Sequence, residues 1–441
     1  MPMKPVSMLK VPTKLEMPIK LKTPIKKLLL AGAGHAHIGL LRRLRTEHLA
    51  GTAIMNVEVT LITEQTQSIY SGMLPGWMAG HYHLDDISID IKSLCLQAGV
   101  RFIQRPIVKI DAESRNVVTA NDAYFDYDVL SLNTGADTDM HWLKEATIAK
   151  AIPSINNSTA TTPAVIAIRP LSVFIDRWQA ILLEAQLSSH YRLAIVGAGA
   201  AATELVMAAQ VALKRINPKH QVYLVCGEHL LSGFHQRFKR RVISQLKRHG
   251  VAMIHARAIG YSHGQLLISC DSLPESLPMD AVISATGVTG AAWTECTDLE
   301  TVDNGFVAVN ATQQSISHPN VFAVGDVATR VDQKVAHSGV HAVHGGAIVA
   351  DNLLSYLARE SASSRSMLDN SVPSKSLLSK SLLSKSLSNR SLEKYQPRTR
   401  TLYLLSCGDK YAIASWGRIS LQGRWLWYLK RHIDKGFVKS H

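Results

Sequence analysis

Two short apolar runs, each followed by a glycine turn and an amphipathic stretch, organise the chain. Residues 28–31 precede Gly32-Ala33-Gly34 and leucines at helical spacing, and residues 193–196 precede Gly197-Ala198-Gly199. A short apolar run before such a turn indicates a buried strand, and the turn lets a pyrophosphate approach the N–H groups that open the next helix. One copy would equally fit an ordinary strand–turn–helix unit. Two copies predict two nucleotide-binding domains.

The remaining apolar runs predict an α/β fold. The run at 57–62 is the expected partner strand of the first unit, and the run at 221–226 is that of the second. Two later strands end in similar small-residue turns, which supports two domains of one architecture. We expect further strands within 102–118, 128–132, 281–284 and 320–324, helices at 171–187 and 339–357, and a loop at 70–76.

The order of these segments predicts a first domain that is interrupted by the second. The proline- and lysine-rich start and the serine-rich run near residue 380 lack the composition for a packed core, so we expect both to be disordered. The tail combines two expected strands with an aromatic, basic helix. The expected division is a basic arm at 1–24, a first domain at 25–150 and 290–358, a second domain at 165–289, a disordered insertion at 359–397 and a C-terminal segment at 398–441.

Basic residues concentrate at the two ends of the chain. The 441 residues carry a formal net charge of +14, although residues 28–358 are slightly acidic. Basic edges suit an anionic membrane surface or a nucleic acid, and the sequence holds no nucleic-acid-binding motif. No apolar run reaches the roughly 20 residues of a membrane span, and the N-terminus lacks the apolar core of a secretory signal.

From this charge pattern we expect a cytoplasmic protein with no nucleic-acid partner. The C-terminal helix and the basic arm would bring it to the inner face of the membrane as a peripheral protein. Solvated tails without a partner are one alternative, and packing of the C-terminal helix against a partner subunit is another.

Five scattered cysteines limit the redox and metal chemistry. No two of them form a C-x-x-C pair, which metal sites and thioredoxin-type dithiols commonly use. We therefore expect no metal site, and reduced structural thiols of the kind found in the cytosol. The five are Cys95, Cys226, Cys270, Cys296 and Cys407.

The order Gly-x-Gly, Thr-Gly, Gly-x-Gly, Ala-Thr-Gly and Gly-Asp resembles the FAD-dependent pyridine nucleotide-disulfide oxidoreductase family. Within it, the chain is most similar to type II NADH dehydrogenases. The runs 32–37 and 70–76, with Trp425 and Trp427, also resemble the flavoprotein module fused to some bacterial selenide, water dikinases. The resemblance implies two Rossmann-like domains that bind FAD and NAD(P)H. Each would be a three-layer α/β unit with a central parallel sheet, the second inserted in the first, and a small C-terminal α+β segment would follow.

The resemblance assigns FAD to the first domain. Glu64 lies just past the strand at 57–62, where dinucleotide folds hold the ribose hydroxyls, and it equally fits a surface glutamate. Pro75 belongs to the expected loop that can reach the flavin ring. The other implied FAD residues are Gly32, Gly34 and His35 at the pyrophosphate, Thr134 and Gly135 at a crossover turn, and Gly325 and Asp326 at the ribityl chain.

The resemblance assigns the nicotinamide nucleotide to the second domain. Glu204 stands where the family carries a glutamate near the nicotinamide, and a surface glutamate is the alternative. His341 and His344 fall near the quinone-side glutamines of type II dehydrogenases. Glu204 and His341 are therefore the catalytic candidates. The implied binding residues are Gly197, Gly199 and Ala202 at the pyrophosphate, with Thr286 and Gly287 at the second crossover turn.

Two residues depart from the family pattern. His37 replaces the usual packing glycine after the first turn, and Cys226 stands where the family usually carries an acidic residue at the end of the partner strand. The choice between NADH and NADPH therefore stays open.

Together these features predict an FAD-dependent NAD(P)H dehydrogenase. The flavin carries the chemistry, and the protein supplies geometry and electrostatics. Without a cysteine pair, electrons would pass directly to a quinone or similar acceptor. Two alternatives remain: a soluble reductase of an electron-carrier protein or selenium-linked acceptor, and a flavin-binding sensor without turnover. The sequence also leaves a homodimer open.

Overall fold

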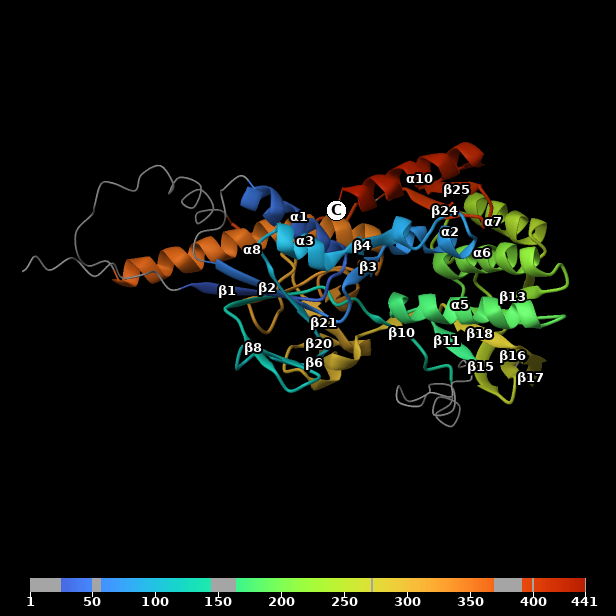
Figure 1. The fold of residues 1–441 in the computed structure, drawn as a ribbon, viewed down its shortest axis with the longest axis horizontal. Coiled ribbons are helices and arrows are strands. Elements are labelled where there is room, and N and C mark those ends of the chain that lie inside the picture. Colours follow the sequence, from blue (N-terminus) through green and yellow to red (C-terminus); the bar gives the residue numbers. More distant parts are fainter. Residues whose placement is uncertain are drawn as a thin grey trace, which may run out of the picture.

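The first domain is built on a five-stranded parallel sheet (Figure 1). The structure, a computed structural model, describes residues 25–49, 57–143, 164–270, 273–368, 391–398 and 400–440. The sheet order brings β22, from late in the chain, beside β9, which in turn pairs with β1. In order, the strands are β22 (Val321–Ala323), β9 (Val129–Leu132), β1 (Lys26–Ala31), β2 (Val57–Thr63) and β5 (Arg101–Gln104).

Both faces of this sheet are covered, which explains why β1 is apolar throughout. Leu28 and Leu30 pack among helices on one face, whereas Leu29 and Ala31 belong to a separate core on the other. The helices are α1 (His35–Leu49), α3 (Ile91–Gln97) and α8 (Gly339–Leu368). The opposite layer holds the sheets β6 (Ile107–Asp111), β7 (Asn116–Thr119) and β8 (Tyr124–Asp126), and β20 (Thr301–Val302), β21 (Phe306–Val309) and β23 (Ala328–Arg330).

The second domain repeats this plan. Its parallel sheet runs β11 (Val165–Ala167), β18 (Ala281–Ser284), β12 (Arg192–Val196), β13 (Gln221–Val225) and β14 (Ala252–Ile254). Leu193 and Ile195 face one core, and Ala194 and Val196 face the other. One covering layer holds α5 (Leu171–Leu187), α6 (Ala200–Ile216) and α7 (Gln236–Arg248); the other is the antiparallel sheet β15 (Arg257–Ser262), β16 (Gln265–Cys270) and β17 (Leu273–Pro278).

Two connections join the domains as a small antiparallel pair. The chain leaves the first domain through β10 (Asp137–Thr138) and returns through β19 (Val288–Thr289), and these strands pair with each other. Because β22 then joins the first sheet, the second domain is inserted in the first. The predicted α/β fold with two Rossmann-like units is confirmed.

The C-terminal segment adds a third sheet and a long helix. The tail was expected to hold two strands, but the structure has three. They are β24 (Tyr403–Ser406), β25 (Ala412–Trp416) and β26 (Ile419–Gly423), followed by α10 (Arg424–Lys439). The short turn at residue 417 lets β26 pair with β25, which the sequence reading merged.

Helix α10 bridges the two domains. Figure 1 shows it extending from the β24–β25 sheet, beside the second domain, to α1 in the first. Near its start, Leu426 and Trp427 pack on Ala412 and Ala414. Near its end, the ring of Phe437 lies against residues of the first domain.

The expected loop at 70–76 is instead mostly helical. Pro75 stands at the start of a helix, where its missing N–H leaves no bond unmade, and the neighbouring Leu74 and Met78 are buried in the core beside α6. That packing outweighs the glycine and proline signals for a loop. The elements are β3 (Gln67–Ile69), η1 (Ser71–Met73), α2 (Leu74–Met78), η2 (Asp85–Ile87) and β4 (Ser88–Asp90).

Both ends of the insertion expected to be disordered at 359–397 are ordered in the structure. Helix α8 continues to Leu368, and residues 391–398 pack against the first domain through Tyr395. The remainder of the insertion and the basic arm at 1–24 lie outside the described residues.

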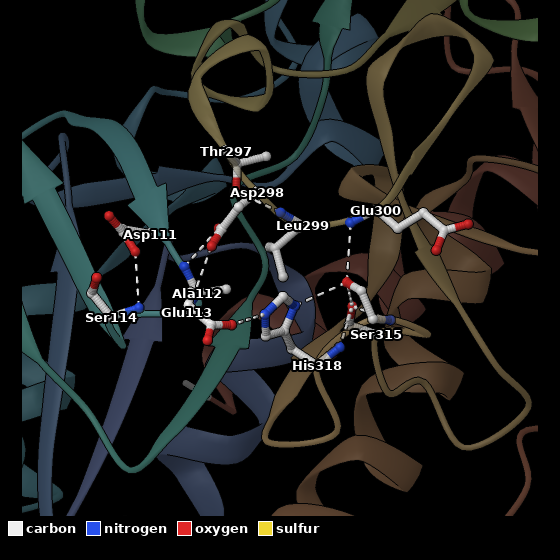
Figure 2. A network of polar contacts seen from close by, with 11 residues as sticks. Asp111, Ala112, Glu113, Ser114, Thr297, Asp298, Leu299, Glu300, Ser315 and His318 are labelled. Atoms are coloured by element: carbon white, nitrogen blue, oxygen red, sulfur yellow. Dashed lines mark hydrogen bonds and ion pairs between the residues drawn. The ribbon is translucent and has the colours of Figure 1, made fainter.

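A polar network fixes the layer opposite the helices of the first domain (Figure 2). The Asp298 carboxylate follows η3 (Ala292–Cys296) and accepts from the backbone N–H groups of Ala112 at 2.6 Å and Glu113 at 2.8 Å. Although burial opposes the shift, these donors lower the pKa of Asp298. Nearby, His318 lies 3.8 Å from the Glu113 carboxylate. The network connects the β6–β7 turn to the segment that carries Asp298 and His318.

Two further short helical turns are η4 (Asp303–Gly305) and η5 (Gly325–Val327).

Candidate functional site

The first glycine turn is packed against the end of β9. Gly32 has a φ of +87°, and a Cβ there would lie 2.5 Å from the Thr134 Cα atom. A Cβ on Gly34 would lie 2.4 Å from the Asn133 side-chain oxygen. Both positions therefore require glycine, and the structure packs Gly32 and Gly34 against Asn133 and Thr134.

Asn133 holds this junction together, and the sequence analysis missed it. Its Oδ1 accepts from the N–H groups of Ala36 at 3.1 Å and His37 at 3.2 Å, so it caps the start of α1. Its Nδ2 donates to the carbonyl of Val324 at 2.6 Å. One side chain thus joins the Gly-x-Gly turn, the Thr-Gly turn and the Gly-Asp turn. The signal was its place before Thr134-Gly135.

His37 occupies the position of the third glycine in the family pattern. One ring nitrogen lies 2.6 Å from the carbonyl of Gly32 and the other 2.8 Å from the Ser131 hydroxyl. Burial lowers the pKa of His37 to about 4, so the ring is neutral at neutral pH. In place of the usual glycine, the His37 ring therefore stabilises the turn through these two contacts.

Asp326 meets the chemical requirement for holding a sugar hydroxyl. Gly325 has a φ of +80°, and one oxygen of Asp326, Oδ2, accepts from Arg169 at 2.7 Å. The other oxygen, Oδ1, is buried and has no hydrogen-bond partner among the described residues. A buried oxygen of this kind can accept from a ligand hydroxyl. Arg169, which precedes α5, is a partner that the sequence analysis missed.

The other FAD candidates lie on three different elements. Glu64 is exposed just past β2, and Pro75 is buried in α2. His35 opens α1, and its ring lies near Tyr70 at 5.4 Å and Phe437 at 5.7 Å between centroids. Helix α10 therefore reaches the glycine turn of the first domain.

The second glycine turn leaves its helix start open. Gly197 is required, because a Cβ there would lie 2.2 Å from the Ala285 carbonyl oxygen, and Ala202 packs closely beneath it. At Gly199, by contrast, a Cβ would meet nothing within 4 Å. Among the residues that the structure describes, no side chain caps the start of α6. Free N–H groups at a helix start fit a pyrophosphate.

The Ala-Thr-Gly turn that closes the second domain contacts the first crossover. The Thr286 hydroxyl donates to the Asp139 carbonyl at 2.5 Å, and Gly287 accepts from Asp139 N at 2.9 Å. The two predicted crossover turns are thus linked through β10 and β19.

Cys226 closes β13 without supplying a charge. Its thiol is buried and lies 3.8 Å from the Nδ1 atom of His255. Burial raises the pKa of the Cys226 thiol to about 11. This position therefore carries no carboxylate that could set the preference between NADH and NADPH.

Glu204 points toward the C-terminal segment. Its carboxylate accepts from the N–H of Ser406 at 2.6 Å, at the end of β24. Some solvent contact remains, yet protein atoms surround the carboxylate closely enough that burial raises the pKa of Glu204 to about 7, against the opposing charge of Lys430. The pKa of Glu204 therefore lies close to neutral pH.

A buried charged pair on α10 completes this region. Lys430 lies 2.7 Å from Asp434 and donates to the carbonyl of Gly72 at 2.6 Å. The Tyr70 hydroxyl donates to the other Asp434 oxygen at 3.3 Å. Burial raises the pKa of Asp434, and Lys430 opposes that shift. The sequence analysis missed this pair, although Asp434 is the single acidic residue in a basic helix.

His341, the second catalytic candidate, lies in a different place. It belongs to the first turns of α8 and lines a pocket together with Asp326. Its Nδ1 atom lies 2.7 Å from the Tyr395 hydroxyl. Burial lowers the pKa of His341, so its ring is neutral at neutral pH.

Comparisons with known proteins agree with this geometry. The pyridine nucleotide-disulphide oxidoreductase family model matches residues 26–346. The chain belongs to that family. It is therefore an FAD-dependent oxidoreductase that uses a nicotinamide nucleotide. The open start of α6 and the unpartnered oxygen of Asp326 fit these two cofactors.

Individual relatives share the fold at low identity. A type II NADH:quinone oxidoreductase from Staphylococcus aureus is 22% identical over 359 residues, which cover 78% of this chain and 86% of the relative. The sulfide:quinone oxidoreductase of Aquifex aeolicus gives a TM-score of 0.69 at 17% identity, covering 94% of this chain and 91% of that one. NDH2 from Plasmodium falciparum, solved with NADH, gives 0.67 at 12% identity, covering 94% and 98%.

Within the described ranges, no group of three or more His, Cys, Asp or Glu side chains is placed to hold a metal ion. In the same ranges, no helix is both long and apolar enough to cross a bilayer.

The raised pKa of Glu204 makes stability depend on pH in a defined direction. Between about pH 4.5 and 7 the folded protein holds a proton that the unfolded chain releases, so the free energy of unfolding falls as pH rises. Glu204→Gln keeps the acceptor for Ser406 without the charge. We expect the variant to match the parent at pH 4.5 and to be more stable by roughly 2 kcal/mol at pH 8. Urea unfolding of both proteins between pH 4.5 and pH 8 measures this difference in the free energy of unfolding.

The exposed Glu275 supplies a matched control. Glu275→Gln is expected to follow the parent at every pH. A Glu204→Gln difference that stays constant with pH would contradict the assigned pKa.

Proposed function

We propose that this chain passes electrons from NAD(P)H through FAD to a quinone, without a redox disulfide. The overall reaction converts NAD(P)H, a proton and a quinone into NAD(P)⁺ and a quinol. FAD, when bound, accepts the hydride and hands on two electrons. The protein's part is to bind both nucleotides, exclude water and manage protons.

The state of the cysteines carries this proposal. Among the described residues, Cys95, Cys226, Cys296 and Cys407 are free thiols. Burial raises the pKa of Cys95 to about 12 and that of Cys407 well above its ordinary value. Dithiol exchange needs a thiolate, so these buried thiols are poorly suited to it. Direct transfer to a diffusible acceptor fits better.

Glu204 is our candidate for proton exchange in this reaction. Its pKa near 7 suits a group that gains and loses a proton at neutral pH. Lys430 and Asp434 form an ion pair beside Glu204, at the contact between α10 and Gly72. His341 is the second candidate, on the wall of the Asp326 pocket.

We further propose that the C-terminal segment docks on an anionic membrane surface. Five large apolar residues of β25, β26 and α10 are each about half exposed: Trp416, Ile419, Leu421, Trp425 and Tyr428. Register places Trp416 beside Ile419, on the sheet face that carries α10. Aromatic side chains with flanking Arg and Lys are typical of interfacial helices.

A soluble reductase of an electron-carrier protein is the second candidate, and one feature favours it. Helix α7 carries six basic side chains and no acidic one, which suits an acidic carrier protein. They are Arg237, Lys239, Arg240, Arg241, Lys247 and Arg248.

Anaerobic reduction tests the proposed reaction. We expect NADH or NADPH to bleach the FAD of the loaded protein within seconds, and a soluble quinone to restore the colour. Rapid-scanning absorbance follows both halves. Bleaching that only a carrier protein or oxygen reverses would replace quinone by the second candidate. Failure to bleach with either nucleotide would contradict both.

Vesicle sedimentation tests the membrane surface. The parent protein is expected to pellet with vesicles that contain anionic lipid and to be released by salt. Removing two exposed indoles by Trp416→Ser with Trp425→Ser should weaken binding about tenfold, because each buries apolar area in the interface. Tyr124→Ser, at an exposed site on β8, is the control. Equal binding of all three proteins would refute the docking surface.

A further inference from the structure

The pocket at the start of α8 collects polar groups from segments far apart in the sequence. Asp326 comes from η5, His341 from α8 and Tyr395 from the segment at 391–398. Two buried oxygens there, Oδ1 of Asp326 and Oγ of Ser338, have no hydrogen-bond partner among the described residues. Buried polar atoms are normally paired, so the pocket is suited to a polar ligand.

Tyr395 is fixed in this pocket by its backbone as well as its ring. Only 6% of the residue is exposed. Its N–H donates to the carbonyl of Ala311 at 2.8 Å, and its carbonyl accepts from the Arg330 guanidinium at 2.9 Å. Its hydroxyl lies 2.7 Å from Nδ1 of His341. The residue is therefore placed to orient His341.

The protonation states decide the direction of the Tyr395–His341 hydrogen bond. Burial raises the pKa of Tyr395 and lowers that of His341, so at neutral pH the phenol keeps its proton and the imidazole is neutral. A neutral imidazole has one accepting nitrogen and one N–H. When the phenol donates to Nδ1, the imidazole proton is held on Nε2.

We propose that Tyr395 fixes His341 as an Nε2–H donor on the wall of this pocket, and that this N–H binds a ring carbonyl oxygen. Two carbonyl sources fit this chemistry: the pyrimidine ring of the flavin and the quinone. The quinone source rests on the proposed function, whereas the flavin source rests on the pocket that His341 shares with Asp326. Tyr395 is a positioning residue, and His341 is the group that contacts the ligand.

Three variants test the pair. Tyr395→Phe removes one hydroxyl and keeps the packed ring, His341→Leu removes the imidazole and its N–H donor, and the double variant reveals whether the two act together. Each is loaded with FAD. The flavin midpoint potential is measured by redox titration, and kcat and KM are measured with a soluble quinone. Tyr124→Phe, at an exposed tyrosine on β8, is the control.

The two carbonyl sources give different results. A flavin carbonyl predicts that both single variants lower the midpoint potential equally, because a donor to the carbonyl favours the electron-rich reduced ring. A quinone carbonyl predicts an unchanged potential and a rise in KM for the quinone of about threefold to tenfold. In either case the double variant should equal a single one.

Two results would overturn the proposal. One is a Tyr395→Phe protein that matches the parent in both potential and KM. The other is a double variant whose effects are the sum of the two single ones. If the parent reduces no quinone, the proposed function fails, and the potential measurement then decides this inference alone.

Discussion

The architecture of the first domain depends on one buried amide. Asn133 caps α1, accepts the N–H of Gly34 on its carbonyl and reaches Val324 with its side-chain nitrogen. It therefore binds together three turns that are about a hundred or more residues apart in the chain. A Cβ at Gly32 or Gly34 would collide with this junction. These glycines are therefore needed for the packing of one turn against another as well as for the approach of a phosphate.

The two domains share a plan but close their turns differently. In the first, Asn133 satisfies N–H groups at the start of α1 and His37 braces the turn from below. In the second, the start of α6 has no side-chain cap, and space opens beside Gly199. Helix α10 spans the two domains and brings Lys430 and Asp434 to the contact between them. The first domain therefore has a cross-linked glycine turn, and the second has an open one.

Local patterns predicted the repeated elements well, because apolar runs and glycine turns report on nearby structure. The helix expected at 171–187 has those same bounds. The sequence could not reveal contacts made across the fold. Tyr395 lies beyond a serine-rich insertion, and the Lys430–Asp434 pair acquires meaning only against Gly72. The run at 70–76 became helical because buried neighbours outweighed its proline.

Equilibrium titration of the apoprotein with FAD, followed by flavin fluorescence, tests the role of Asn133 most directly. Asn133→Ala leaves two N–H groups and one carbonyl without partners, so we predict that the Kd for FAD rises at least about tenfold. Asn320→Ala removes a similar amide bond from the opposite end of β22 and should leave the Kd unchanged. An Asn133→Ala protein that is folded and binds FAD as tightly as the parent would contradict the account.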